Sequence, residues 1–399
     1  MSSGVPAEQR RRVVIAVGLA QLLAWASSYY LLAIIAAPMA AGLGLPKVAV
    51  FASFSLALLL GAALGPAVGA RIDRYGGRAV LLASNGVFAL GLAVLALAQG
   101  PITLVLGWLL IGAAMPMGLY DAAFSTLVGL YRSEARMSIV GVTLIAGFAS
   151  TFGWPLSAAV EAHYGWRATC ALWAVLHLLV GATIHYRLVP RTRPQPIAVA
   201  ATDSAALATV PPSTTVLWLL AGVFTCSGFV FASMAAHLPR VLEAVGCTPA
   251  AAVAAAALVG ASQVAARLAD AGFLSRLHPL VSAHVSSALH PLGALLLVVF
   301  GAQFAAVFTV LHGAGIGLMT IVKGTLPLAL FGAAGFGRRS GLLEAPSRVA
   351  QATAPVVFGL WLDRYGAGVL WISGGIAFAG FVGVLLVGRL TRSDGVSAG

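Results

Sequence analysis

Two ionisable residues lie inside long apolar stretches of the sequence, where charge is not expected. Asp121 lies in the apolar stretch 103–130, and Lys323 lies in the stretch 302–331. A charged side chain in a membrane-spanning helix is costly, so such a residue marks a candidate functional site. A carboxyl group shielded from water can bind and release a proton, and an ammonium group can hold that carboxylate or an anionic solute. We therefore predict proton coupling at Asp121 and solute binding at Lys323, with a static ion pair or a locally hydrogen-bonded aspartate as the alternative.

Polar and aromatic residues on neighbouring stretches add to this candidate site. Gln263, Arg267 and Asp270 follow one another at spacings of four and three, which places them on one helix face. Arg267 is a candidate carboxylate ligand or a cytoplasmic gate. Trp25 and Tyr29 share a face of the stretch 13–41, where they line a solute cavity or pack against neighbours.

Three more residues are candidates for solute binding. Tyr120 directly precedes Asp121, and Ser233 and His237 share a face of the stretch 215–242. Histidine changes charge near neutral pH, so His237 suits proton coupling, although a gate at the outer end fits its position equally well. Glu344 and Arg348 lie four residues apart at the start of the stretch 341–362, which predicts a gate or a structural pair.

The composition indicates which elements position these residues. Of 399 residues, 60% are hydrophobic and only 9% are charged, against about 25% charged in soluble domains. The lipid bilayer is the environment that accepts such a chain. The net charge of +12 would suggest nucleic acid in a soluble protein. Here the basic residues separate apolar runs, so we expect a membrane protein with no nucleic-acid partner.

A helix needs about 20 apolar residues to cross a hydrocarbon core of about 30 Å. The first apolar run is too long for a signal peptide and is expected to remain as the first span. The sequence predicts twelve spans, at 13–41, 47–70, 79–98, 103–130, 137–160, 167–187, 215–242, 249–271, 278–299, 302–331, 341–362 and 367–388.

The basic residues predict how the spans are oriented. With the N-terminus inside, 18 of the 23 Lys and Arg residues fall on the cytoplasmic side, four fall outside, and Lys323 lies within a span. This asymmetry predicts cytoplasmic termini, an even number of spans and a place in the cell inner membrane.

The sequence also divides into two similar halves. Residues 1–188 and 215–399 each hold six predicted spans, and 189–214 form a polar, proline-containing cytoplasmic linker. Similar motifs recur at an offset of about 200 residues: Gly112-Ala-Ala with Gly313-Ala-Gly, and Pro155 with Pro355. Parallel repeats of this kind are a transporter architecture.

The strongest local motif is the sequence GARIDRYGGR in the loop between the second and third spans. Gly69 is expected to allow close helix packing, and Gly76 is expected to allow a sharp turn. Asp73 places an acid among Arg74, Arg78 and other basic residues. We expect its partners to be these arginines or the positive N-terminal end of the helix near 340.

This loop closely resembles the G-x-x-x-D-R-x-G-x-R signature of the major facilitator superfamily, and the whole chain resembles that family in length, span number, central loop and duplication. The resemblance implies an all-α membrane fold of two six-helix bundles with alternating access, in which Asp73 helps to latch the halves together. It also implies that helices 1, 4, 7 and 10 line a central cavity, so Asp121 and Lys323 would face each other. An arginine in helix 8, here Arg267, is similar to that of monocarboxylate-type and oxalate-type members, where it binds carboxylate.

Other classes of function lack their motifs. The sequence contains no G-x-S-x-G or H-E-x-x-H motif, no intramembrane pair of aspartates and no phosphate-binding loop. We therefore expect no enzyme, cofactor or metal, and a monomer rather than a channel built by oligomeric symmetry. The prediction is a proton-coupled secondary transporter, a symporter of a small organic anion such as a monocarboxylate. The alternative is proton-driven efflux of a drug-like or toxic molecule.

Overall fold

The computed structural model describes residues 7–131, 135–191, 214–272, 278–331 and 336–396, which are helical with short connections and contain no strand. They form two compact units. The first unit is Met1–Gln195 with Ala235–Pro239, and the second is Pro196–Met234 with Arg240–Gly399.

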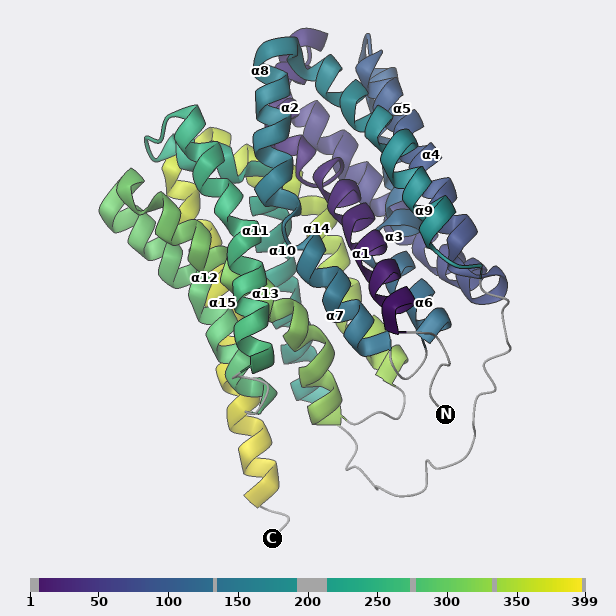
Figure 1. The fold of residues 1–399 in the computed structure, drawn as a ribbon. Helices are drawn as coiled ribbons and strands as arrows, with labels where there is room; N and C mark the ends of the chain where they lie inside the picture. The colour runs from purple at the N-terminus through teal and green to yellow at the C-terminus, as the bar shows by residue number, and fades with distance from the viewer. Residues whose placement is uncertain (1–6, 132–134, 192–213, 273–277, 332–335, 397–399) are drawn as a thin grey trace. The chain divides into compact units, whose positions relative to one another are not determined.

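The helices of the first unit are α1 (Ala7–Ala26), α2 (Leu31–Leu43), α3 (Lys47–Tyr75), α4 (Gly77–Ala96), α5 (Pro101–Gly118), α6 (Tyr120–Tyr131), α7 (Ala135–Ala146), α8 (Ala149–Leu176), the π-helix η2 (His177–Gly181) and α9 (Ala182–Leu188). In this unit α5 packs against α3 and α4, and α1 lies beside α7 (Figure 1). Val17, Leu127 and Val142 belong to one of its buried apolar cores.

The helices of the second unit are α10 (Thr214–Ala244, without Ala235–Pro239), α11 (Pro249–Gly272), α12 (Pro279–Phe300), the short η4 (Gly301–Phe304), α13 (Ala305–Phe331), α14 (Phe336–Tyr365), the short η5 (Gly366–Gly368) and α15 (Val369–Val396). Here α13 packs against α11 and α12, and α15 packs against α12 (Figure 1). Phe224, Val322 and Leu343 belong to a core that joins α10, α13 and α14.

Helices approach very closely at glycines in both units, and one such contact in each unit can be compared. A methyl group on Gly112 would lie 2.4 Å from the carbonyl oxygen of Ala57, where α5 meets α3. A methyl group on Gly313 would lie 2.6 Å from the carbonyl oxygen of Val259, where α13 meets α11. Small residues let membrane helices approach this closely. The two glycines are those that the sequence repeat aligns, and their partners are separated by a similar offset, 202 against 201 residues.

Three spans that the sequence predicts as continuous are interrupted in the first unit. The stretch 13–41 breaks between Ala26 and Leu31, 103–130 breaks at Leu119, and 137–160 breaks between α7 and α8. Serine, tyrosine and glycine, which are weaker helix formers than alanine or leucine, occupy the first and third breaks. Pro116 lacks a backbone donor in the turn before the second break.

Within the described residues, nine helical segments are long and apolar enough to cross a membrane. Three of them, Met137–Leu188, Pro279–Phe331 and Leu343–Thr391, contain 52, 53 and 49 residues. Each of these three includes a glycine with positive φ: Gly165 (80°), Gly301 (73°) and Gly366 (54°). Residues with a side chain rarely adopt this conformation, so these glycines mark places where the chain can change direction.

Candidate functional site

Three of the predicted solute-binding residues come together at two of the helix breaks in the first unit. The Trp25 ring lies 4.8 Å from the Tyr29 ring and 5.1 Å from the Tyr120 ring, centroid to centroid. Tyr29 lies in the turn between α1 and α2, and its ring meets Phe54 of α3 edge to face at 5.6 Å. All three predicted residues are half-buried. We call Trp25, Tyr29, Tyr120 and Asp121 the broken-helix cluster.

Side chains from other helices satisfy backbone groups at these breaks. The amide Nε2 of Gln21 donates to the Gly118 carbonyl at 2.6 Å, next to the break between α5 and α6. The indole Nε1 of Trp154 donates to the Tyr30 carbonyl at 2.9 Å, in the turn between α1 and α2. Irregular backbone at membrane depth requires such partners or a water-filled cavity. The breaks are therefore built into the packing of the unit.

Asp121 lies in the first turn of α6, with an exposed side chain. The helix N-terminus carries a partial positive charge, which favours a carboxylate at this position. The break at Leu119 therefore provides Asp121 with a favourable dipole that a continuous helix would lack. Tyr120 stacks on Phe124 with ring centroids 5.0 Å apart, which helps to fix the start of α6.

A buried polar chain that the sequence did not reveal lies beside this cluster. Ser27 Oγ lies 2.7 Å from His177 Nε2, His177 Nδ1 lies 3.0 Å from Asn85 Oδ1, and Asn85 Nδ2 lies 2.7 Å from His185 Nδ1. All four side chains are buried. We call these four residues the Asn85 chain. His177 and His185 lie on one predicted helix, two turns apart, and that spacing was the available signal.

Asn85 determines the hydrogen positions in this chain. Its Nδ2 also donates to the Leu81 carbonyl at 2.8 Å, so the nitrogen must face Leu81 and His185. His185 Nδ1 is therefore an acceptor, and His177 Nδ1 must donate to the amide oxygen of Asn85. The chain links the turn after α1, α4, the π-helix and α9.

Lys323 has an acidic partner within the second unit. Its Nζ lies 3.0 Å from Glu344 Oε2, and both side chains are about one quarter exposed, at 25% and 26%. The ammonium group also lies 5.4 Å from the centroid of the Phe224 ring. Glu344, which the sequence pairs with Arg348, thus pairs across helices with Lys323. Asp121 and Lys323 lie in different units, and their contact stays a prediction.

The polar face of α11 is buried in the second unit. Arg267 is 6% exposed, and its guanidinium donates to Gln263 Oε1 at 3.3 Å and to Thr320 Oγ1 at 3.4 Å. Asp270 accepts a hydrogen bond of 2.7 Å from Ser282 Oγ of α12. These residues share one face of α11, as their spacing predicts, and that face packs against α12 and α13.

Ser233 and His237 on α10 are both fully buried. Among the described residues, the hydroxyl of Ser233 has no hydrogen-bond partner. The His237 ring lies 4.3 Å from the Phe51 ring. A role for either residue in solute binding stays a prediction.

The loop motif between α3 and α4 forms the expected turn at Gly76, where φ is 83°. Arg78 donates to the Tyr186 carbonyl, and its guanidinium lies 5.2 Å from the Tyr186 ring centroid, which attaches the loop to α9. Arg74 lies 5.3 Å from the Tyr75 ring centroid. Among the described residues, a methyl group on Gly69 would have no neighbour within 4 Å, so its predicted close helix contact is not seen there. The side chain of Asp73 lies outside the described residues.

The described residues contain no group of three or more His, Cys, Asp or Glu side chains that could hold a metal ion. The free cysteines are Cys170, Cys226 and Cys247.

The family model of the Major Facilitator Superfamily matches residues 17–321, and the curated proteins include no match. Among solved structures, a mutant of the nucleoside transporter NupG is similar with a TM-score of 0.74 and 15% identity, over 95% of this chain and 99% of that one. A bacterial homologue of the human lysosomal transporter Spinster, in an inward-facing and occupied conformation, has a TM-score of 0.66 and 15% identity, over 96% of this chain and 98% of that one. At this identity the two structures establish the fold alone. Because the family model covers most of the chain, the protein is a multi-pass membrane transporter, not an enzyme, and belongs to the major facilitator superfamily.

Proposed function

We propose that this transporter moves a small organic anion, such as a monocarboxylate, together with a proton by alternating access. The observation that carries the proposal is Lys323, an ammonium group inside an apolar helix whose partner is the carboxylate of Glu344 at 3.0 Å. A solute carboxylate can form the same charge-assisted hydrogen bond. Exchange of Glu344 for a solute carboxylate keeps an anion beside the partly buried Lys323 ammonium group, so this charge is never left without a partner.

We propose that the protein crosses the cell inner membrane twelve times and has both termini in the cytoplasm. Each of the three longest apolar segments, of 52, 53 and 49 residues, is long enough for two crossings. Each also contains a positive-φ glycine. Two crossings in each of these three segments turn nine segments into twelve spans, which supports the division into halves 1–188 and 215–399 joined by 189–214. We propose that the protein works as a monomer.

Proton coupling is assigned to Asp121. Asp121 is the acidic residue in the first turn of α6, within an apolar segment. Protonation would neutralise a charge that is costly inside a membrane-spanning segment. Trp25, Tyr29 and Tyr120 surround this position with half-buried rings that can contact the apolar part of a solute. Further proposed contacts are Ser233, His237 and Arg267, and the proposed latch between the halves consists of Gly69, Asp73, Arg74, Gly76 and Arg78.

The test is flux into proteoliposomes under an imposed pH gradient, with labelled acetate, lactate, oxalate and benzoate. We expect the wild type to accumulate at least one anion. Lys323→Ala should weaken binding by about 10- to 100-fold, as expected for loss of a charge-assisted hydrogen bond of about 1.5–3 kcal/mol. Asp121→Asn should abolish the response to the pH gradient.

The sequence offers a matched control, because Lys47 is the only other lysine of the chain. Lys47 begins α3 at the end of an apolar segment, so Lys47→Ala should transport normally. Normal gradient-driven accumulation by both Lys323→Ala and Asp121→Asn would refute the proposal. Transport that needs an opposing solute but no pH gradient would replace symport by exchange.

The aromatic rings of the broken-helix cluster favour a second candidate, proton-driven export of a flat aromatic or drug-like compound. Such a compound can stack on Trp25 and Tyr29, whose centroids lie 4.8 Å apart. One of the similar structures is a nucleoside transporter, so uridine and adenosine belong in the same panel. Movement of these compounds that survives in Lys323→Ala and fails in Trp25→Ala would favour this candidate over anion transport.

A further inference from the structure

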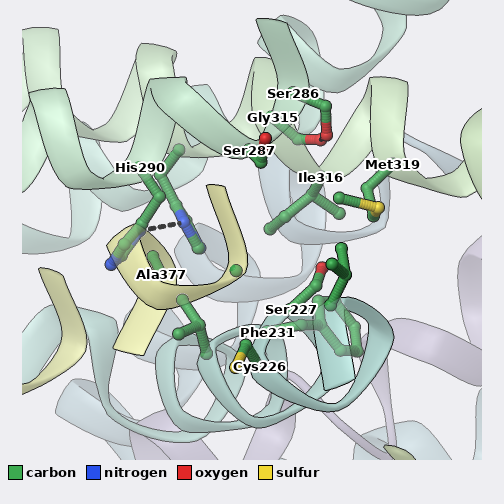
Figure 2. Close-up of a pocket in the computed structure, with 14 residues that line it drawn as sticks. Cys226, Ser227, Phe231, Ser286, Ser287, His290, Gly315, Ile316, Met319 and Ala377 are labelled. Atoms are coloured by element: carbon green, nitrogen blue, oxygen red, sulfur yellow. Dashed lines mark hydrogen bonds between the residues drawn. The ribbon is translucent and has the colours of Figure 1, made fainter. Parts of the chain in front are cut away.

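A small pocket in the second unit is separate from Lys323 and Glu344 and is lined by side chains with titratable or hydroxyl groups. Figure 2 shows His290, Ser286 and Ser287 of α12 on one side, and Cys226 and Ser227 of α10 on another. His312 of α13 completes the polar lining. The volume available to the centres of water molecules is about 40 Å³, and a single water needs about 10–15 Å³ by this measure. The pocket therefore has room for water.

Two histidines form a direct hydrogen bond at this pocket. His290 Nδ1 and His312 Nδ1 lie 2.7 Å apart, as the dashed line in Figure 2 marks. The two side chains are 6% and 2% exposed. Phe308 covers both rings, since it stacks on His312 at 5.9 Å and meets His290 edge to face at 5.5 Å. The pair therefore packs against an apolar ring on one side and faces the pocket on the other.

The bond between like atoms limits how many protons the pair can hold. One Nδ1 must carry a hydrogen and the other must present its lone pair. In the neutral pair, the ring that donates through Nδ1 has a bare Nε2, which can take up a proton without breaking the bond between the rings. The neutral pair holds two ring protons, one on each imidazole, and this uptake brings the number to three. A fourth proton would place hydrogens on both Nδ1 atoms and break the bond between the rings. The pair therefore takes up one proton above its neutral state.

The Nε2 atom of His290 supports the same conclusion. His290 Nε2 is buried and, among the described residues, has no hydrogen-bond partner. A buried polar atom of this kind calls for a water, an ion or a proton. A metal ion between the Nδ1 atoms does not fit, because two metal–nitrogen bonds of about 2.0–2.1 Å would hold those atoms farther apart than 2.7 Å.

The surrounding elements place little charge near the pair. On α10 the titratable residue that lines the pocket is Cys226, and α15 contributes Ala377 and Gly380. On α11, which packs against α13, Arg267 bonds to Thr320, and Asp270 accepts from Ser282. Thr320 and Ser282 each lie eight residues from the nearer histidine, about 12 Å along a helix. His284 of α12 lies partly buried, with its Nδ1 2.6 Å from the Leu280 carbonyl, and Lys323 lies eleven residues beyond His312 on α13.

We infer that the His290–His312 pair is a proton-binding site that holds a single exchangeable proton, with water in the adjoining pocket as the route for its arrival and release. The inference rests on the proposed proton-coupled function and adds a second proton-binding position to Asp121. In the binding step, a hydronium ion in the pocket transfers one proton to the free Nε2 lone pair, which leaves water and one imidazolium hydrogen-bonded to a neutral imidazole.

The direct test uses the full chain with ¹⁵N-labelled histidine in lipid nanodiscs, titrated by NMR between about pH 5 and 8, the range in which histidine ordinarily titrates. In the wild type we expect a ¹⁵N–¹⁵N coupling across the hydrogen bond and the appearance of one imidazolium for the pair on acidification. His290→Gln and His312→Gln should each remove this signal. His284→Gln, on the same helix and outside the pocket lining, should preserve it.

A transport arm separates the inference from the proposed function. With the anion that the wild type accumulates, His290→Gln and His312→Gln should lose about tenfold in gradient-driven accumulation, within the usual range for coupling between two bound ligands. Exchange of labelled for unlabelled anion without a gradient should persist. Two neutral rings throughout the titration, two imidazoliums formed together, or unchanged accumulation in both variants would overturn the inference. A wild type that binds the proton at this pair but shows no gradient-driven transport would refute the proposed function alone.

Discussion

Replacing Asn85 with leucine tests whether the Asn85 chain stabilises the first unit. The amide serves three partners, at 3.0 Å to His177, 2.7 Å to His185 and 2.8 Å to the Leu81 carbonyl. Leucine has a similar shape and leaves Nδ1 of both buried histidines without that partner. Each stranded polar group costs about 1–3 kcal/mol, so we expect the free energy of unfolding to fall by about 2–6 kcal/mol.

The assay is reversible unfolding in mixed detergent micelles, followed by circular dichroism. Ser84→Ala is the matched control. Ser84 is the neighbouring buried residue on α4 and bonds to the same Leu81 carbonyl, at 2.8 Å, but to no histidine among the described residues. Loss of the Ser84 hydrogen bond should lower the free energy of unfolding by no more than about 0.5–1.5 kcal/mol.

A variant in which His177 and His185 are both leucine isolates the interaction of Asn85 with the two histidines. If both histidines are already leucine, Asn85→Leu should cost much less, because replacing all partners by apolar groups can be nearly neutral. An equal loss in the wild-type and double-leucine backgrounds would refute the reasoning, as would a loss no larger than that of Ser84→Ala. The difference between the effects of Asn85→Leu in the two backgrounds measures the interaction energy between Asn85 and the histidines.

Two further predictions concern packing and thiol reactivity. Gly112→Ala places a methyl group 2.4 Å from the Ala57 carbonyl oxygen and should destabilise the protein by about 1–3 kcal/mol in the same unfolding assay. Gly129→Ala meets open space and should be neutral or stabilising; equal effects of the two would contradict the close contact. Burial, and then the Glu243 carboxylate, raises the pKa of the Cys247 thiol, which lies between α10 and α11. Less of it is thiolate at neutral pH, so iodoacetamide should modify Cys247 slowly and Glu243→Gln should accelerate the reaction, as peptide mass spectrometry would show. An unchanged rate in Glu243→Gln would count against the contribution of that carboxylate.

The sequence correctly predicts that the chain is helical, because lipid requires every backbone group to find a partner within its own segment. Long apolar runs then have one available structure, and their lengths reveal it. The breaks at 27–30 and at Leu119 were not predicted, because they depend on partners from distant helices. Gln21 reaches the Gly118 carbonyl and Trp154 reaches the Tyr30 carbonyl, and neither contact has a signature in local periodicity.

The sequence also could not predict which side chains pair between different helices. Glu344 has Arg348 one turn away, so helix spacing alone favours that pair. The structure places the Glu344 carboxylate beside Lys323, 21 residues away, in a contact that helix spacing does not indicate. Asn85 similarly reads as a lone polar residue in an apolar span, and its two histidine partners lie 92 and 100 residues further along the chain. Such pairs follow from tertiary packing and not from spacing.

The two units differ at the position that matters most for the proposed mechanism, and electrostatics explains the difference. Gly112 and Gly313 make the same kind of contact, with Ala57 and Val259, so α5 and α13 are comparable up to that point. Beyond it, α5 ends and Asp121 follows in the first turn of α6, whereas Lys323 lies within an unbroken α13. A helix N-terminus stabilises a carboxylate and destabilises an ammonium. A break is therefore favourable before the aspartate and unfavourable before the lysine, which depends on the acidic side chain of Glu344 for its counter-charge.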